Sequence, residues 1–171
     1  MSQYIKNIEK LINIKFNNKD LLLKSFIHKS YNKESNNEKL EFLGDRVIGL
    51  VISKKLITLY PDENEGIIDK KFASLVNKKT CAKVFRYLNL KKFIKTGSSF
   101  KTLHFSDDRI LSDTCEALIG SIYLDQGFVN TEKFVLKIWK NFIINSKVTE
   151  IDSKTKLQEF SLKKFKKLPM Y

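Results

Sequence analysis

Apolar residues recur at helical spacing along most of the chain, and no stretch shows the alternation of a half-buried strand. The first run, residues 2–16, interleaves isoleucine and leucine with lysine, which predicts an amphipathic helix. Capping asparagines and aspartates, and Pro61 after the longest run, indicate where later helices begin and end. Further helices are expected at about residues 18–27, 37–60, 64–77, 79–88 and 131–145, and one after position 107 or 108, preceded by a long loop at 95–107. The pattern predicts an all-α fold.

Three carboxylates lie beside an apolar stripe in residues 37–45, the run NEKLEFLGD. If this run is helical, Glu38, Glu41 and Asp45 share one face at positions i, i+3 and i+7. The neighbouring stripe consists of Leu40, Leu43, Val47, Leu50 and Val51. Like charges this close raise one another's pKa, and the basic neighbours Lys39 and Arg46 are expected to point elsewhere on the helix. A divalent cation would relieve the repulsion.

A second acidic pair, Asp113 and Glu116, lies at i and i+3 in the run LSDTCEALIG, whose small and apolar residues suit a packed helix. Two helices that cross with these acidic faces opposed would bring four or five carboxylates to one point. Hard oxygen ligands of this kind suit Mg²⁺ or Mn²⁺. An acid pair at this spacing is also common on a solvated helix face, so spacing alone leaves both interpretations open.

Both acidic runs resemble motifs of the ribonuclease III family, the endonucleases of double-stranded RNA. Residues 37–45 are similar to the signature of that family, and residues 111–125 resemble its second acidic helix. Shorter matches occur in the family's order at residues 27–31, 60–61, 65–66 and 75–77. The resemblance implies an all-α, dimeric, ribonuclease III-type endonuclease domain, which we assign to residues 1–148.

The resemblance also implies the chemistry. Glu41, Asp45, Asp113 and Glu116 match the positions that hold the catalytic metal, which would be Mg²⁺ with Mn²⁺ as a substitute and no small-molecule cofactor. Asp45 and Glu116 are among the implied catalytic residues. The implied reaction is metal-assisted hydrolysis of double-stranded RNA to 5′-phosphate and 3′-hydroxyl products with short 3′ overhangs, in the processing of ribosomal and messenger RNA.

Other positions take their expected roles from the same resemblance. Glu38 and Glu65 match accessory catalytic acids. Phe42 matches the position that inserts into the partner subunit of a homodimer. Arg46 stands where a small residue is usual, and Cys115 stands where a small or β-branched residue is common, but no acid of the family pattern is missing.

The end of the chain resembles the start of another domain. Residues 152–160 and 168–171 are similar to the linker, first helix and first strand entry of a double-stranded-RNA-binding domain, so Lys156, Gln158 and Glu159 are candidate RNA contacts. Only the first helix of such a domain is present. We therefore expect residues 149–171 to be a linker and one solvated amphipathic helix of an incomplete domain.

The charge of the chain supports a nucleic-acid partner. There are 32 basic and 19 acidic residues, a net charge of +13, and all but three of the basic residues are lysines. Ten of the lysines lie in residues 133–171, with only three acids. Because lysine is a flexible point charge, this composition favours binding to the phosphate backbone over reading of the bases.

Several other classes of protein are excluded by the same sequence. Cys81 and Cys115 are too few for a disulfide framework or a zinc site, and His28 and His104 lack zinc-ligand spacing. For His28 we expect a hydrogen-bonded structural role. No apolar run is long enough for a membrane span or forms a signal core, so a cytoplasmic protein is expected.

Two alternatives stay open. A family member that binds double-stranded RNA without cutting it would keep the fold and the dimer, although every acid is present. A basic helical DNA-binding protein would leave the acidic runs unexplained.

Overall fold

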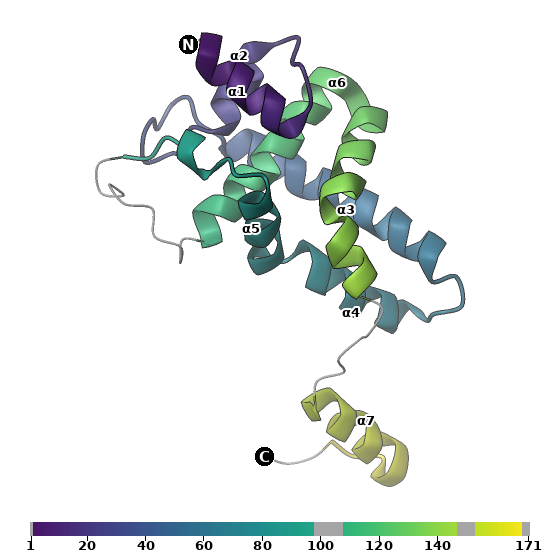
Figure 1. Ribbon diagram of the computed structural model, residues 1–171. Helices are drawn as coiled ribbons and strands as arrows, with labels where there is room; N and C mark the ends of the chain where they lie inside the picture. Colours follow the sequence, from purple (N-terminus) through teal and green to yellow (C-terminus); the bar gives the residue numbers. More distant parts are fainter. Residues whose placement is uncertain (1, 98–107, 147–152, 169–171) are drawn as a thin grey trace.

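The computed structural model describes residues 2–97, 108–146 and 153–168, whose regular secondary structure is helical except for one isolated bridge between Ile27 and Lys95 (Figure 1). This confirms the predicted all-α fold. The helices are α1 (Ser2–Ile12), α2 (Lys19–Ser25), α3 (Glu38–Leu59), α4 (Glu65–Val76), α5 (Lys78–Tyr87), the short 3₁₀ helix η1 (Lys91–Phe93), α6 (Asp108–Asn145) and α7 (Ser153–Phe165). Within these described residues, no helix has the length and apolar character needed to cross a membrane.

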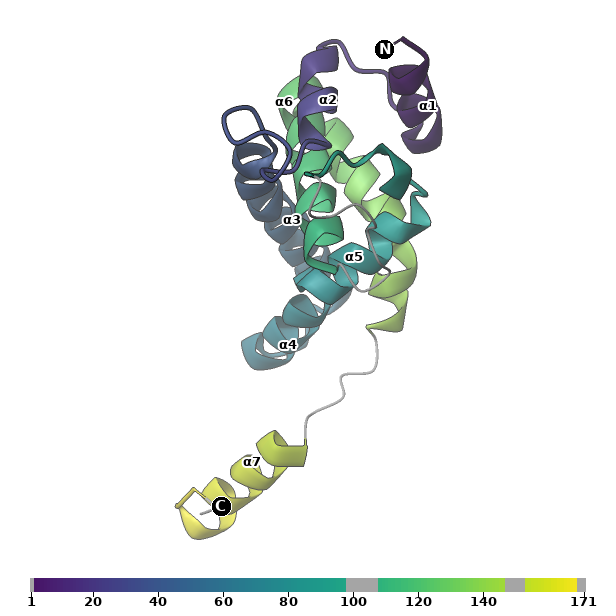
Figure 2. The same cartoon turned by 90° about the vertical axis from the view of Figure 1, so that its left-hand side faces the viewer.

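The first part of α6 is the centre of the fold, with α3 packed along one side and α5 along another (Figures 1 and 2). Every residue from position 110 to 122 is buried, which is typical of a helix surrounded by protein on all sides. The small and apolar residues of this stretch make such burial possible. Its two acids, Asp113 and Glu116, are therefore held in the interior, where a carboxylate needs a partner.

Two glycines allow α3 and α6 to approach closely. A Cβ atom on Gly44 would lie 1.8 Å from the backbone oxygen of Glu116, and one on Gly120 would lie 2.2 Å from the backbone oxygen of Leu40. Only glycine fits at either position, because any larger residue would force the two backbones apart. This crossing brings the acidic face of α3 opposite that of α6.

A loop before α3 is tied to the edge of this crossing. The His28 amide donates to the Lys95 carbonyl (3.0 Å), and the Lys95 amide donates to the Phe26 carbonyl. The Asn37 amide donates to the Ile27 carbonyl (2.9 Å). These bonds fix residues 27–30 next to the first turn of α3.

Most predicted helix boundaries agree with the structure to within two residues. The side chain of Asn18 caps α2 and that of Asn64 caps α4, as expected. The first helix ends four residues early, at Ile12. The helix predicted over residues 131–145 is the second part of α6, which continues through a kink at Gly127 (φ 74°).

One predicted core position is wrong. Leu50 is 58% exposed, whereas Ile48 and Ile52 on the same helix are almost fully buried. Leu40, Val47 and Val51 are buried as predicted. The predicted stripe extended too far around α3, since α6 covers a different part of that helix.

The C-terminal helix α7 lies apart from the other helices in both views (Figures 1 and 2). It matches the single helix expected after residue 152, and Gln158 is partly buried on it. The side chains of Lys156 and Glu159, like His104 and the predicted boundary near residue 148, lie outside the described residues. The division into two domains stays a prediction.

Candidate metal centre

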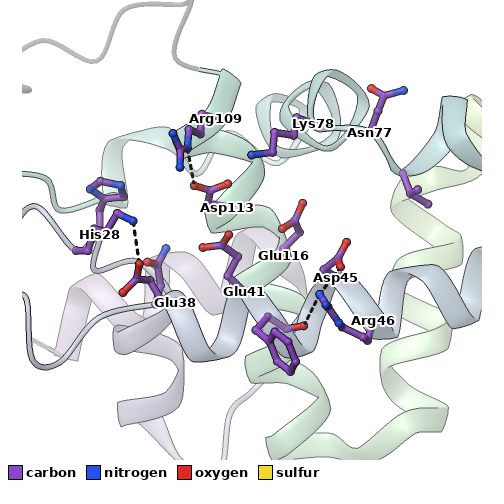
Figure 3. Close-up of a pocket in the computed structure, with 14 residues that line it drawn as sticks. His28, Glu38, Glu41, Asp45, Arg46, Asn77, Lys78, Arg109, Asp113 and Glu116 are labelled. Atoms are coloured by element: carbon purple, nitrogen blue, oxygen red, sulfur yellow. Dashed lines mark hydrogen bonds and ion pairs between the residues drawn. The ribbon is translucent and has the colours of Figure 1, made fainter.

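A pocket of about 550 Å³ opens between the N-terminal parts of α3 and α6 (Figure 3). Helix α3 contributes Glu38, Glu41 and Asp45 to its lining, and α6 contributes Asp113 and Glu116. These acids were singled out in the sequence on two runs separated by more than sixty positions. The helix crossing brings all five acids to the lining of one pocket.

Three of the acids form a compact group. Glu41, Asp113 and Glu116 each offer one carboxylate oxygen, and these oxygens all lie within 4.8 Å of one another. Their side chains converge in the close-up (Figure 3). The set consists of oxygen only, from two rigid helices, and it matches the hard ligands that Mg²⁺ and Mn²⁺ prefer.

Burial makes the charged form of these three carboxyl groups unfavourable. Asp113 is 7% exposed and Glu116 is 8% exposed. Burial, followed by the nearby charges of Asp45, Asp113 and Glu41, raises the pKa of Glu116 from 4.5 to about 7, although a hydrogen bond from Ser112 acts in the opposite direction. Burial also raises the pKa of Glu41 and of Asp113. A bound cation would remove this penalty, because it stabilises the charged form.

Four cationic side chains surround the acidic group. Lys29 pairs with Glu38 (Nζ to Oε1, 2.9 Å), and Arg109 approaches Asp113 (Nε to Oδ2, 3.9 Å). Lys78, at the start of α5, lies across the pocket (Figure 3), and its charge lowers the pKa of Glu41 and Asp113 against the effect of burial. Arg46 is the fourth. The pocket therefore has an anionic floor and a cationic rim.

The expectation that Arg46 points elsewhere on the helix is wrong. Its Nη1 atom lies 2.6 Å from Oδ2 of Asp45, and its guanidinium lies 4.1 Å from the centre of the Phe42 ring. The side chain is long enough to fold back along α3, which a helical wheel does not show. Asp45 lines the pocket, but its oxygens stay outside the group of three.

The remaining candidates lie at different distances from the group. Glu38 lines the pocket and is held by Lys29. Glu65 is not among the lining residues, because it begins α4 while Val76, at the other end of that helix, reaches the pocket. Phe42 is 64% exposed at the pocket edge.

His28 has the hydrogen-bonded structural role that was predicted. Its Nδ1 atom lies 2.8 Å from Oγ of Ser30, and the same hydroxyl accepts a hydrogen bond from the Gly97 amide. Burial lowers the pKa of His28, while the charge of Asp113 raises it. The ring lies in the wall of the pocket, with its Nδ1 atom engaged by Ser30.

Comparison with known proteins agrees with this geometry. The Ribonuclease-III-like family matches residues 18–142, which is most of the chain. Ribonuclease 3 of Pelagibacter ubique is 52% identical over 164 residues, or 96% of this chain and 74% of that protein. The chain belongs to the ribonuclease III family. Ribonuclease 3 of Buchnera aphidicola is 39% identical over 170 residues, covering 98% of this chain and 75% of that protein.

Solved structures of ribonuclease III share the same fold. The nuclease domain of the Campylobacter jejuni enzyme superposes with a TM-score of 0.76 at 38% identity, covering 81% of this chain and 98% of that one. A Dicer structure from Pichia stipitis matches with a TM-score of 0.62 at 20% identity, which shows likeness of fold alone. The predicted resemblance to the ribonuclease III family is thus confirmed.

Sequence reasoning missed several residues of this ribonuclease III pocket. Arg109 precedes Asp113 by one helical turn, so an i, i+4 pair could have indicated it. Asn37 directly precedes Glu38 and lies four residues before Glu41, so the local spacing of the signature run could have indicated it. Lys29 and Lys78 reach the pocket from two other places in the chain, and no local spacing connects them to the acids. Only the packing of α3, α5 and the 27–30 loop on α6 brings these two lysines there.

Proposed function

We propose that this protein is a Mg²⁺-dependent endoribonuclease that cuts double-stranded RNA as a homodimer. The observation that carries the proposal is the group of three carboxylates, from two crossing helices, inside a pocket with a cationic rim. Membership of the ribonuclease III family supports the reaction class. The proposed products carry 5′-phosphate and 3′-hydroxyl ends with short 3′ overhangs, in the processing of ribosomal and messenger RNA.

The donor set fits a divalent cation. We propose Glu41, Asp113 and Glu116 as ligands, with Asp45 as the fourth once its side chain turns away from Arg46. The raised pKa of Glu116 supports this role, because the buried carboxylate gains most from a cation. When bound, the cation would supply Lewis acidity toward the phosphodiester and lower the pKa of the attacking water.

The protein's own groups bind and orient the RNA strand. Lys29, Lys78 and Arg109 offset the repulsion between the acidic floor and the phosphate backbone, since each lies at the pocket rim. Glu38 holds Lys29 in position through their ion pair. Gln158, Lys156 and Glu159 of the C-terminal segment are proposed as further RNA contacts. Cys81 and Cys115 are buried and free, in line with the reducing cytoplasm that we propose as the compartment.

The exposed side of α3 supports a homodimer. Exposed apolar residues are normally scattered singly over a protein surface. Phe42 (64% exposed), Leu50 (58%) and Ile57 (64%) instead lie along one stripe of that helix. The nuclease domain of the Campylobacter jejuni enzyme has a region involved in dimer formation. We propose that the stripe is the contact between two copies and that each copy cuts one strand.

Incubation of the purified protein with a long RNA duplex tests the proposal. We expect short duplexes in Mg²⁺, binding without efficient cutting in Ca²⁺, and no cleavage in EDTA. Glu116→Gln should lose most cleavage yet keep its affinity for RNA, which rests on the lysines. Binding without cleavage in every metal would favour the non-cutting alternative, and preference for a DNA duplex would favour the DNA-binding one.

Mixed dimers test the arrangement of the two sites. A heterodimer of a wild-type chain and a Glu116→Gln chain should nick one strand only. Cleavage of both strands by this heterodimer would contradict the division of labour between the two copies.

A further inference from the structure

Asn37 is the residue immediately before α3, and its backbone is fully engaged. Its amide donates to the Ile27 carbonyl (2.9 Å), and its carbonyl accepts from the Glu41 amide (2.8 Å). Its side chain lines the acidic pocket and the residue is only 1% exposed. The position of the carboxamide is therefore fixed by the fold.

The carboxamide nitrogen of Asn37 is a buried donor without an acceptor. It is the one buried side-chain nitrogen or oxygen atom of the described residues that has no hydrogen-bond partner. A buried polar group left unpaired costs about 1–3 kcal/mol. A donor retained at that cost, inside a functional pocket, calls for a specific explanation.

Helix capping does not explain this donor. The neighbouring Asn36 already serves the start of α3, since its Oδ1 accepts from the Glu38 amide (3.0 Å) and its Nδ2 donates to the Lys33 carbonyl (3.0 Å). The Asn37 side chain makes no capping bond. The two adjacent asparagines are both buried, but only the side chain of Asn36 caps the start of α3.

Within the part of the chain that the structure describes, the carboxylate of Glu41 lacks the hydrogen-bond donor that Asn37 could supply. It follows Asn37 by four residues, so the two side chains occupy the same face of the first turn of α3. Among the described residues none donates a hydrogen bond to the Glu41 carboxylate, whose pKa is raised by burial. If one carboxylate oxygen faces a cation, the other still requires a donor, as is usual for carboxylate ligands of metals.

We propose that Asn37 is a positioning residue of the metal centre, whose carboxamide donates a hydrogen bond to the Glu41 carboxylate when Glu41 holds the cation. The inference rests on the proposed metal centre. In this role Asn37 contacts neither RNA nor the cation. Its function is to fix the orientation of the Glu41 carboxylate. When that carboxylate points away from Asn37, the unpaired donor lowers the stability of the fold.

The test compares wild type with Asn37→Leu, which has nearly the same shape but no donor. Without RNA, the affinity for Mn²⁺ is measured by electron paramagnetic resonance, and the melting temperature is measured in EDTA. We expect Mn²⁺ binding about 10-fold weaker in Asn37→Leu. The melting temperature should stay the same or rise by about 2–4 °C, because an unpaired buried donor is removed.

Asn36→Leu is the matched control. It removes two satisfied hydrogen bonds next door, so it should lower the melting temperature and leave the Mn²⁺ affinity within about twofold of wild type. A purely structural role for Asn37 predicts that both variants behave in this way. Opposite responses of the two adjacent asparagines are the signature of positioning.

A double-mutant cycle identifies the group through which Asn37 acts. In a Glu41→Gln background, Asn37→Leu should no longer weaken Mn²⁺ binding, because the charged acceptor is gone. If Asn37→Leu does not fold, Asn37→Ser and Asn37→Ala replace it. The serine variant keeps a donor, so it should bind Mn²⁺ more tightly than the alanine variant.

The outcomes separate this inference from the proposed function. A wild-type protein that does not bind Mn²⁺ would overturn the metal centre itself, and the inference with it. Wild-type binding, combined with unchanged affinity in Asn37→Leu or with an equal loss in the Glu41→Gln background, would overturn the inference alone.

Discussion

Replacing Glu116 by glutamine should make the protein more stable at neutral pH in the absence of metal. The folded-state pKa of Glu116 is raised from 4.5 to about 7, mainly by burial. A raised carboxylate pKa favours folding below the unfolded-state value, and this contribution is lost as the pH rises through the folded-state value. The wild-type protein should therefore lose stability between pH 4.5 and about 7.

The size of the effect follows from the shift. Moving the pKa from 4.5 to about 7 corresponds to at most about 3 kcal/mol, since one pKa unit equals about 1.4 kcal/mol. Little of this is lost to screening by solvent, because Glu116 is 8% exposed. Glutamine keeps an acceptor for the Ser112 hydroxyl, which lies 3.0 Å from the Glu116 carboxylate. For a chain of this length, the melting temperature should differ by about 6–12 °C above pH 7.

Thermal and urea unfolding of both proteins, in EDTA from pH 4.5 to about pH 8, measure the difference. Comparing the two proteins at each pH cancels the contributions of other titrating groups, such as His28. The exposed Glu63→Gln variant controls for the loss of one negative charge and should change stability by less than about 0.5 kcal/mol. Addition of Mg²⁺ should stabilise wild type most at high pH and Glu116→Gln much less. A stability difference that does not vary with pH would refute the reasoning.

Four other changes have expected outcomes. Gly44→Ala should lower the free energy of unfolding by about 3 kcal/mol or more and abolish cleavage, because its Cβ would lie 1.8 Å from the α6 backbone. Gly49→Ala is the control and should be tolerated, since its Cβ would lie 3.6 Å from the nearest side-chain atom. Lys71→Met should lower the free energy of unfolding by about 1–3 kcal/mol, since the buried Lys71 ammonium donates to a carbonyl at the end of α6 (3.0 Å); unchanged melting would contradict this. Phe42→Asp should give a monomer in sedimentation and lose double-strand cleavage, and a fully active monomer would refute the proposed interface. Deletion of residues 152–171 should leave the melting temperature almost unchanged and make duplex binding less dependent on salt; a large drop would mean that the segment packs on the nuclease domain.

The sequence by itself determined most of the helices, several of their caps and the candidate acids of the site. Helical periodicity and capping asparagines such as Asn64 act locally, so they can be read without knowing the fold. The spacing of Glu38, Glu41 and Asp45 also depends only on the helix repeat. The match to family motifs then connected this acidic run to the one at residues 113–116.

Tertiary structure decided how these elements meet. The approach of α3 to α6 at Gly44 and Gly120 sets which side of α3 is covered, and for that reason Leu50 is exposed although it continues the apolar pattern. The continuation of α6 through Gly127 likewise depends on packing on both sides of the kink, since glycine alone does not distinguish a kink from a helix end.

The electrostatics of the site were also beyond the sequence. Lys29 and Lys78 come from two separate segments, and their relation to the acids exists only after folding. The direction in which Arg46 points depends on side-chain rotamers, which are chosen by neighbours such as Phe42 and Asp45. Local patterns fix which residues can be ligands, because helix geometry is local. Burial and charge environment depend on contacts between distant segments, and so only the folded chain determines the pKa of Glu116 and the unpaired donor of Asn37.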